Sequence, residues 1–101
     1  MSVLAELSLF PVGKGESLSP YVTRMVKIIK SSGLNYTLHS MGTCLEGEWQ
    51  EVMDVVNKCF QDLQQDCGRI YLTLKVDYRR GGRNRLVQKV ESVQRQLGEQ
   101  T

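Results

Sequence analysis

The chain has 101 residues, of which 41% are hydrophobic and 24% are charged. These are the proportions of an ordinary globular domain, and they exclude a disordered tail, a collagen-like repeat and a disulfide-rich miniature. We expect one domain over residues 1–101, because a chain of this length holds a single core. Apolar runs are far shorter than the about 18–20 residues of a membrane span, and the N-terminus shows no secretory signal, so a cytoplasmic location is expected.

The net charge of +2 is unevenly distributed along the chain. Residues 1–68 carry five basic and eight acidic side chains, whereas residues 69–101 carry eight basic and three acidic ones. The basic C-terminal third could contact phosphate or an acidic partner. A solvated surface that balances the acidic part of the chain is the simpler interpretation.

The three cysteines and the single histidine do not clearly indicate a metal site or a catalytic site. The chain has an odd number of cysteines, and none of them is in C-x-x-C spacing. This usage is typical of a protein in a reducing compartment. The three are Cys44, Cys59 and Cys67. A zinc site would have to gather His39 with scattered cysteines or carboxylates, so we expect no metal centre. Spacing also allows a nucleophilic pair of Cys44 with His39, but no third group is evident to orient it, and packed cysteines are the expectation.

Strand and helix patterns follow one another from the N-terminus. Alternating apolar residues predict a strand over Val3 to Phe10, which the proline and glycines of residues 11–15 end. Ser19-Pro20 predicts a helix start with the serine as cap, and residues 31–33 end that helix with Gly33 in a left-handed cap. The later predicted elements are a hairpin over 34–40 and 43–46 with its turn at Met41-Gly42, a helix over about 48–66, a strand over 70–78, and a last helix carrying the apolar stripe of 86–97.

The resulting order, β-α-β-β-α-β plus a terminal helix, predicts an α+β, ferredoxin-like sandwich with an extra C-terminal helix. The helices should cover one face of an antiparallel sheet and leave the other open. With the more apolar row of each strand facing the helices, the open face carries Glu6, Ser8, Asn35, Thr37, His39, Cys44, Glu46, Tyr71, Thr73, Lys75 and Asp77. Such a face could be solvated, could pair with a second copy, or could hold a small molecule between two copies.

A fold class does not choose among functions, so specific alternatives were tested on residues. An RNA-recognition domain stacks bases on aromatic residues of its two central strands, and Thr43 to Glu46 contains none. An acylphosphatase needs an arginine in the loop after the first strand, and Pro11 to Glu16 contains none. The chain also lacks a glycine-rich nucleotide motif. We therefore expect neither an enzyme nor a nucleic-acid-binding protein.

Several segments together resemble the small thiamine-binding protein family, the single-domain relatives of YkoF. The matching segments are P-V-G-x-G after the first strand, S-P-Y-V at the helix start, S-G-L-N-Y-T-L-H-S-M-G-T-C-L-E-G-E-W through the hairpin, and the later V-D-Y-R-R-G-G and K-V-E-S-V. The resemblance runs from about Ala5 to Leu97. Its most specific part is Gly42-Thr43 followed by Glu46-Gly47.

The resemblance implies a ferredoxin-like fold, dimers or tetramers assembled through the sheets, and binding of thiamine or its hydroxymethylpyrimidine part, without catalysis or a cofactor. The two-domain YkoF arrangement is absent, so one copy would have to pair with a second chain. The alternative is a regulatory or structural oligomer that contacts a protein or nucleic-acid partner through the basic loop of residues 79–85. A ligand that binds only the folded state would raise the melting temperature and so distinguish the two.

Thiamine carries a cationic thiazolium ring, which needs a carboxylate or an aromatic face, and an aminopyrimidine, which needs fixed polar groups. The candidate site residues are Glu6, Ser8, Tyr36, Thr37, His39, Thr43, Glu46 and Tyr71. Thr43 and Glu46 lie in the most family-like segment. Strand alternation puts Glu46 on the open face and Thr43 on the helix side, so Thr43 either acts from the hairpin end or only closes the turn. On this view, Glu46→Gln weakens thiamine binding and leaves the assembly intact.

Overall fold

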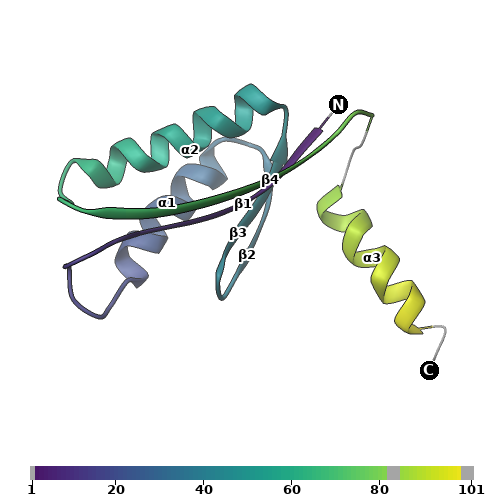
Figure 1. Cartoon of the computed structure of the whole chain (residues 1–101), viewed down its shortest axis with the longest axis horizontal. Helices are drawn as coiled ribbons and strands as arrows, with labels where there is room; N and C mark the ends of the chain where they lie inside the picture. Colours follow the sequence, from purple (N-terminus) through teal and green to yellow (C-terminus); the bar gives the residue numbers. More distant parts are fainter. Residues whose placement is uncertain (1, 82–84, 99–101) are drawn as a thin grey trace.

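The computed structural model describes residues 2–81 and 85–98. Its elements, in chain order, are β1 (Ser2–Pro11), α1 (Ser19–Ser31), β2 (Asn35–His39), β3 (Gly42–Gly47), α2 (Trp49–Gln64), β4 (Ile70–Arg79) and α3 (Arg85–Gly98). The four strands form one antiparallel sheet in the order β2-β3-β1-β4 (Figure 1). This confirms the α+β, ferredoxin-like fold, with β1 and β3 in the centre of the sheet as expected.

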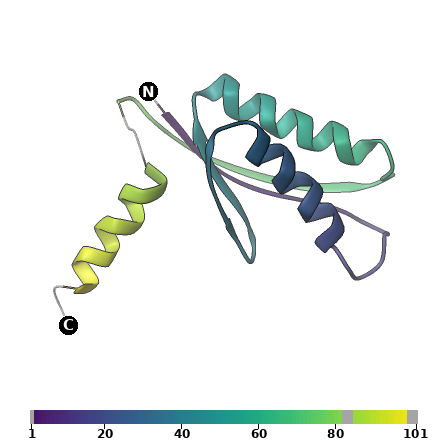
Figure 2. The same cartoon turned by 180° about the vertical axis from the view of Figure 1, so that it is seen from behind.

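The core lies between the sheet and the pair α1 and α2, which cover the same face (Figure 2). Every second residue of β1 is buried there, so the predicted apolar row does face these helices. The buried apolar side chains are Val3, Ala5, Leu7, Leu9, Met25, Ile29, Leu45, Val52, Val55, Cys59, Leu63 and Cys67. Full burial of each larger aliphatic chain stabilises the fold by about 1.5–3 kcal/mol.

The cap of α1 differs from the prediction, which made Ser19 the capping residue. Leu18 is the N-cap, and its carbonyl oxygen accepts hydrogen bonds from the amides of Tyr21 and Val22. Ser19 is therefore already helical, because the proline at residue 20 fits anywhere in the first turn. The end of α1 is confirmed: Gly33 adopts a φ of +78°, in the left-handed region that glycine tolerates best.

The tight turn of the β2–β3 hairpin lies one residue earlier than predicted, at Ser40-Met41, and Gly42 is the first residue of β3. Close packing explains the glycine at this position. A Cβ atom there would lie 3.0 Å from the carbonyl oxygen of Leu7.

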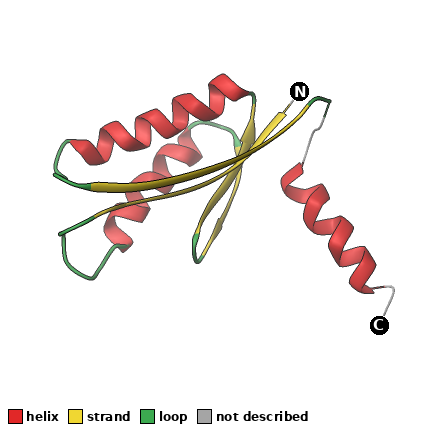
Figure 3. Ribbon diagram, in the orientation of Figure 1, coloured by secondary structure: helices red, strands yellow, loops and turns green. Residues whose placement is uncertain are grey.

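Helix α3 lies apart from α1 and α2 (Figure 3). The register places Glu46, Leu4 and Asp77 in one row across β3, β1 and β4, on the face opposite to α1 and α2. The first residues of α3 bond to both carboxylates of this row. The expectation that all helices share one face is therefore wrong for α3. Within residues 2–81 and 85–98, no helix is long and apolar enough to cross a bilayer.

Candidate functional site

A polar row crosses the open face of the sheet next to the row that holds α3. Register brings Thr37, Cys44, Glu6 and Lys75 side by side on β2, β3, β1 and β4. The Lys75 Nζ atom lies 3.3 Å from Glu6 Oε1, so the two side chains form an ion pair. The Lys75 side chain is 75% exposed in the single chain, so this pair contributes little to its stability.

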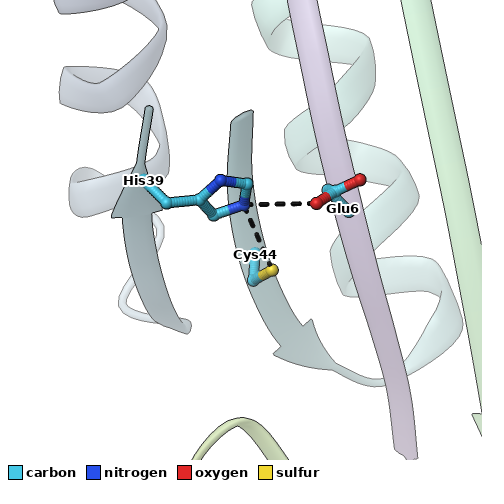
Figure 4. Close-up of side chains that lie close together, drawn as sticks. All are labelled: Glu6, His39 and Cys44. Carbon is cyan, nitrogen blue, oxygen red and sulfur yellow. Dashed lines mark hydrogen bonds and ion pairs between the residues drawn. The ribbon is translucent and has the colours of Figure 1, made fainter. Parts of the chain in front are cut away.

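His39 reaches over this row from the end of β2 and contacts two of its members (Figure 4). Its Nε2 atom lies 3.2 Å from Glu6 Oε2 and 3.7 Å from Cys44 Sγ. Spacing along the chain suggested the pair of His39 with Cys44, whereas Glu6 is far away in the sequence and was expected only on the same face. The antiparallel pairing of Glu6 with Cys44 is what brings the carboxylate to the histidine.

These three side chains are not arranged for nucleophilic catalysis. In a catalytic triad the acid binds the ring nitrogen that does not face the nucleophile. Here Glu6 and Cys44 both contact Nε2 of His39. Burial raises the pKa of the Cys44 thiol, and the nearby Glu6 carboxylate raises it further, so the thiol is not activated as a thiolate. The cluster is better suited to binding than to acyl transfer.

A small cavity opens where the strands separate, and we call it the fork pocket. β1 pairs with β3 only from Val3 to Leu7; beyond Leu7 it continues along β4, while the hairpin diverges (Figure 3). The cavity has a volume of about 270 Å³. It is lined by Ser8, Leu9, Phe10, Leu18, Val22, Met25, Leu38, His39, Ser40, Met41, Gly42 and Thr43. Pockets that bind drug-sized ligands have volumes of about 300–1,000 Å³. The fork pocket is just below the small end of this range, so it fits a single ring better than a larger molecule.

Thr43 brings the least expected chemistry to the fork pocket. The residue is fully buried, and its Oγ1 atom has no hydrogen-bond partner among residues 2–81 and 85–98. It faces the helix side, opposite Leu7 and Leu38, as predicted. Its hydroxyl makes no bond in the hairpin turn, so it does not close that turn. Buried hydroxyls are normally paired with protein, water or ligand, so Thr43 Oγ1 is a candidate contact for a bound molecule.

Glu46 lies on the open face as predicted, but α3 covers it. It is 7% exposed, and its carboxylate accepts hydrogen bonds from the backbone amides of Arg85 at 2.9 Å and Leu86 at 3.4 Å. This contact is not predictable from the sequence, because a helix pattern does not show where the helix docks. Glu46 is thus engaged with a helix N-terminus rather than facing a ligand.

Arg85, the last residue of the proposed basic loop of residues 79–85, takes part in the same contact between α3 and the sheet. Arg85 is 4% exposed, donates to the carbonyl oxygens of Ser2 and Asp77, and forms an ion pair with Asp77 at 2.6 Å. Hydrogen bonds from Lys89, and then from Arg85, lower the pKa of Asp77. Arg79 and Arg80 are exposed, and residues 82–84 of the loop lie outside the described part of the chain.

The other predicted site residues are dispersed. Ser8 lines the fork pocket, and Thr37 is exposed beside Cys44 on the open face. Tyr36 is on the helix side, packed against the core. Tyr71 is exposed and stacks on Phe10, with ring centroids 5.5 Å apart. Phe10 was not among the predicted site residues, although its pairing with Tyr71 and its place on the open face follow from the β1–β4 register.

Known proteins resemble this chain over nearly its full length. A 39% identical UPF0045 protein of Methanothermobacter thermautotrophicus is matched over 94% of this chain and 99% of that protein. A UPF0045 protein of Mycobacterium tuberculosis is 37% identical over 96% of each chain.

Solved structures give the same picture. A hypothetical protein of Methanocaldococcus jannaschii superposes with a TM-score of 0.84 at 32% identity, over 91% of this chain and 95% of that one. A Thermotoga maritima protein, whose name assigns it to thiamine biosynthesis or salvage, gives a TM-score of 0.77 at 29% identity, over 89% and 99%.

The model of the protein family described as "Thiamine-binding protein" matches residues 5–94. That is most of the chain, and it includes both the fork pocket and the Glu6, His39 and Cys44 cluster. The family is named for binding, and none of the relatives described above carries the name of an enzyme. The chain belongs to the thiamine-binding protein family.

Proposed function

We propose that this chain is a non-enzymatic carrier or sensor that binds thiamine, or its hydroxymethylpyrimidine part, in the fork pocket. Family membership and the thiamine-related name of the Thermotoga maritima neighbour support the ligand class. The observation that carries the location is Thr43, a residue of the pocket lining whose buried hydroxyl has no hydrogen-bond partner among the described residues.

The pocket walls suit an aminopyrimidine ring. Such a ring donates and accepts hydrogen bonds, and a hydroxyl can do both as well. Thr43 and Ser8 supply two hydroxyls, while Val22, Met25 and Leu38 supply apolar surface for the faces of the ring. Binding would therefore satisfy a polar group that the free chain leaves buried and unpaired.

The cationic thiazolium ring has a carboxylate within reach of the pocket. A Cβ atom at Gly42, which lines the pocket, would lie 3.6 Å from both Glu6 Cγ and His39 Cε1. Glu6 thus borders the pocket and offers negative charge. On the other side, Phe10 lines the pocket and stacks on Tyr71, which gives an aromatic face for the cation.

We also propose that the functional form is a homo-oligomer that joins copies through their sheets. Leu72, Val76 and Tyr78 lie on the helix side of the edge strand β4, paired with Leu9, Ala5 and Val3, and are each 38–53% exposed. This apolar surface at the β4 edge is unfavourable for a small domain on its own and supports pairing at that edge of the sheet. The alternative, a partner bound through the basic loop, has less support because Arg85 is buried against Asp77.

The test is Thr43→Val, which keeps the shape of the side chain and removes the hydroxyl. We expect the affinity for thiamine and for hydroxymethylpyrimidine, measured by calorimetry with a chelator present, to fall by about 1–3 kcal/mol, or roughly 5- to 150-fold. The melting temperature should stay the same or rise, because an unpaired buried hydroxyl is removed. Thr73→Val, at an exposed position on β4, is the matched control and should change neither quantity.

Two results would overturn the assignment. Equal affinity in the wild type and Thr43→Val would place the ligand elsewhere on the chain. No binding heat from the wild type with either compound would remove thiamine-type ligands from the proposal.

A further inference from the structure

We propose that Glu6, His39 and Cys44 form a zinc site on the open face of the sheet in the thiamine-free chain, where Zn²⁺ would compete with the thiazolium cation for Glu6. The three side chains come from β1, β2 and β3, and Figure 4 shows that they converge on one point. One ligand atom from each lies within 4.8 Å of the others.

The distances match the edges of a zinc tetrahedron. Zinc bonds of about 2.3 Å to sulfur and about 2.0–2.1 Å to nitrogen or oxygen give edges of about 3.6 Å for S···N and about 3.3 Å for N···O. The structure has 3.7 Å between Cys44 Sγ and His39 Nε2, and 3.2 Å between His39 Nε2 and Glu6 Oε2. Two of the three edges therefore match, and the third, between Glu6 and Cys44 Sγ, is within 4.8 Å.

The donor set selects the kind of metal. One sulfur, one imidazole nitrogen and one carboxylate oxygen suit zinc, whereas Ca²⁺ and Mg²⁺ prefer oxygen ligands alone. A thiolate and a carboxylate together balance the charge of the ion. The Glu6 and His39 side chains are each 36% exposed, so a fourth position is open to water, as in zinc sites that react rather than only stabilise.

Neighbouring groups already bond to two of the three ligands. Glu6 uses Oε1 for Lys75, at 3.3 Å, which leaves Oε2 for the metal. The Met41 amide donates to Nδ1 of His39 at 3.4 Å, so in the metal-free chain the ring proton sits on Nε2, between Glu6 and Cys44. Zinc binding would move that proton to Nδ1, at the expense of this one long bond, and would release the thiol proton of Cys44 to solvent.

The experiment uses the untagged, reduced and chelator-stripped chain, with Co²⁺ as a spectroscopic probe for zinc. We expect one Co²⁺ per chain, with the thiolate charge-transfer band and the visible bands of a tetrahedral site, all lost on adding one equivalent of Zn²⁺. Cys44→Ser should abolish the charge-transfer band. Mutation of a group that only supports a metal ligand typically weakens metal binding about 10- to 100-fold. Cys44→Ser and His39→Gln remove the ligands themselves, so each should weaken zinc binding by more than that. Cys67→Ser, which alters a cysteine near the end of α2, is the control and should bind like the wild type.

Circular dichroism of each variant shows that a loss of metal does not reflect unfolding. The proposal is overturned if the wild type binds no Co²⁺ at one per chain, or if the charge-transfer band persists in Cys44→Ser. Both measurements are made without thiamine, and the thiamine titration contains a chelator, so failure of either proposal leaves the other standing.

Discussion

The carboxylate of Glu46 lies over the first turn of α3, where two backbone amides donate to it. A negative charge at a helix N-terminus pairs with unsatisfied amides and with the positive end of the helix dipole. Glu46 thereby links the centre of the sheet to a helix that lies apart from α1 and α2. The direct ligand contact that the family-like segment suggested for Glu46 stays a prediction beside this role.

Glu46→Gln should loosen α3 while leaving thiamine affinity nearly unchanged. We expect amide hydrogen exchange in α3 to lose about 1–2 kcal/mol of protection, because a neutral acceptor replaces a charge at the helix N-terminus. Glu91→Gln, an exposed position on the same helix, is the control and should not change that protection. Unchanged protection in Glu46→Gln together with weaker thiamine binding would return Glu46 to the ligand site.

At the scale of elements, α3 is held by polar contacts instead of its apolar stripe. Arg85 and Lys89 bond to Asp77, while Val90, Val93 and Leu97 are 53–59% exposed. Periodicity predicted the helix correctly, because spacing along the chain sets it. The docking face could not be predicted, because an apolar stripe normally faces the core, and here a buried charged residue decides the contact.

Acid should release α3 before the rest of the fold. Asp77 accepts hydrogen bonds from Lys89 and Arg85, and these lower its pKa below the ordinary value of 3.8. The stabilisation is therefore fully present above pH 3.8 and is lost as the pH falls through the lowered value. In an NMR titration below pH 4, amide signals of α3 should shift and broaden before those of α1.

The control for this titration is Asp77→Asn, in which α3 should be loosened already at neutral pH and should lack this acid transition. If α3 and α1 respond together in the wild type, Asp77 is not the group that holds α3.

For the whole molecule, much of the architecture could be read from alternation and periodicity. The order of strands and helices along the chain, and the apolar row of β1 that faces α1 and α2, follow from those patterns. The approach of Glu6 to His39 and Cys44 does not, because it depends on the register between distant strands. The fork pocket depends on where β1 and β3 part, a feature that no local pattern encodes.

The exposed apolar residues of β4 and α3 lead us to expect self-association. Light scattering at micromolar concentration should give the mass of a dimer or a tetramer, because pairing would remove this surface from water. A monomer at that concentration would contradict the proposed assembly, although the fork pocket of each chain would remain.

The central claim is that the fork pocket holds a pyrimidine-type ligand against Thr43, and a crystal structure of the chain grown with thiamine tests it most directly. We expect density for the aminopyrimidine ring between α1 and the hairpin, with one ring atom within about 2.7–3.2 Å of Thr43 Oγ1. Density for thiamine at another place on the chain, with the fork pocket filled only by water, would contradict the account.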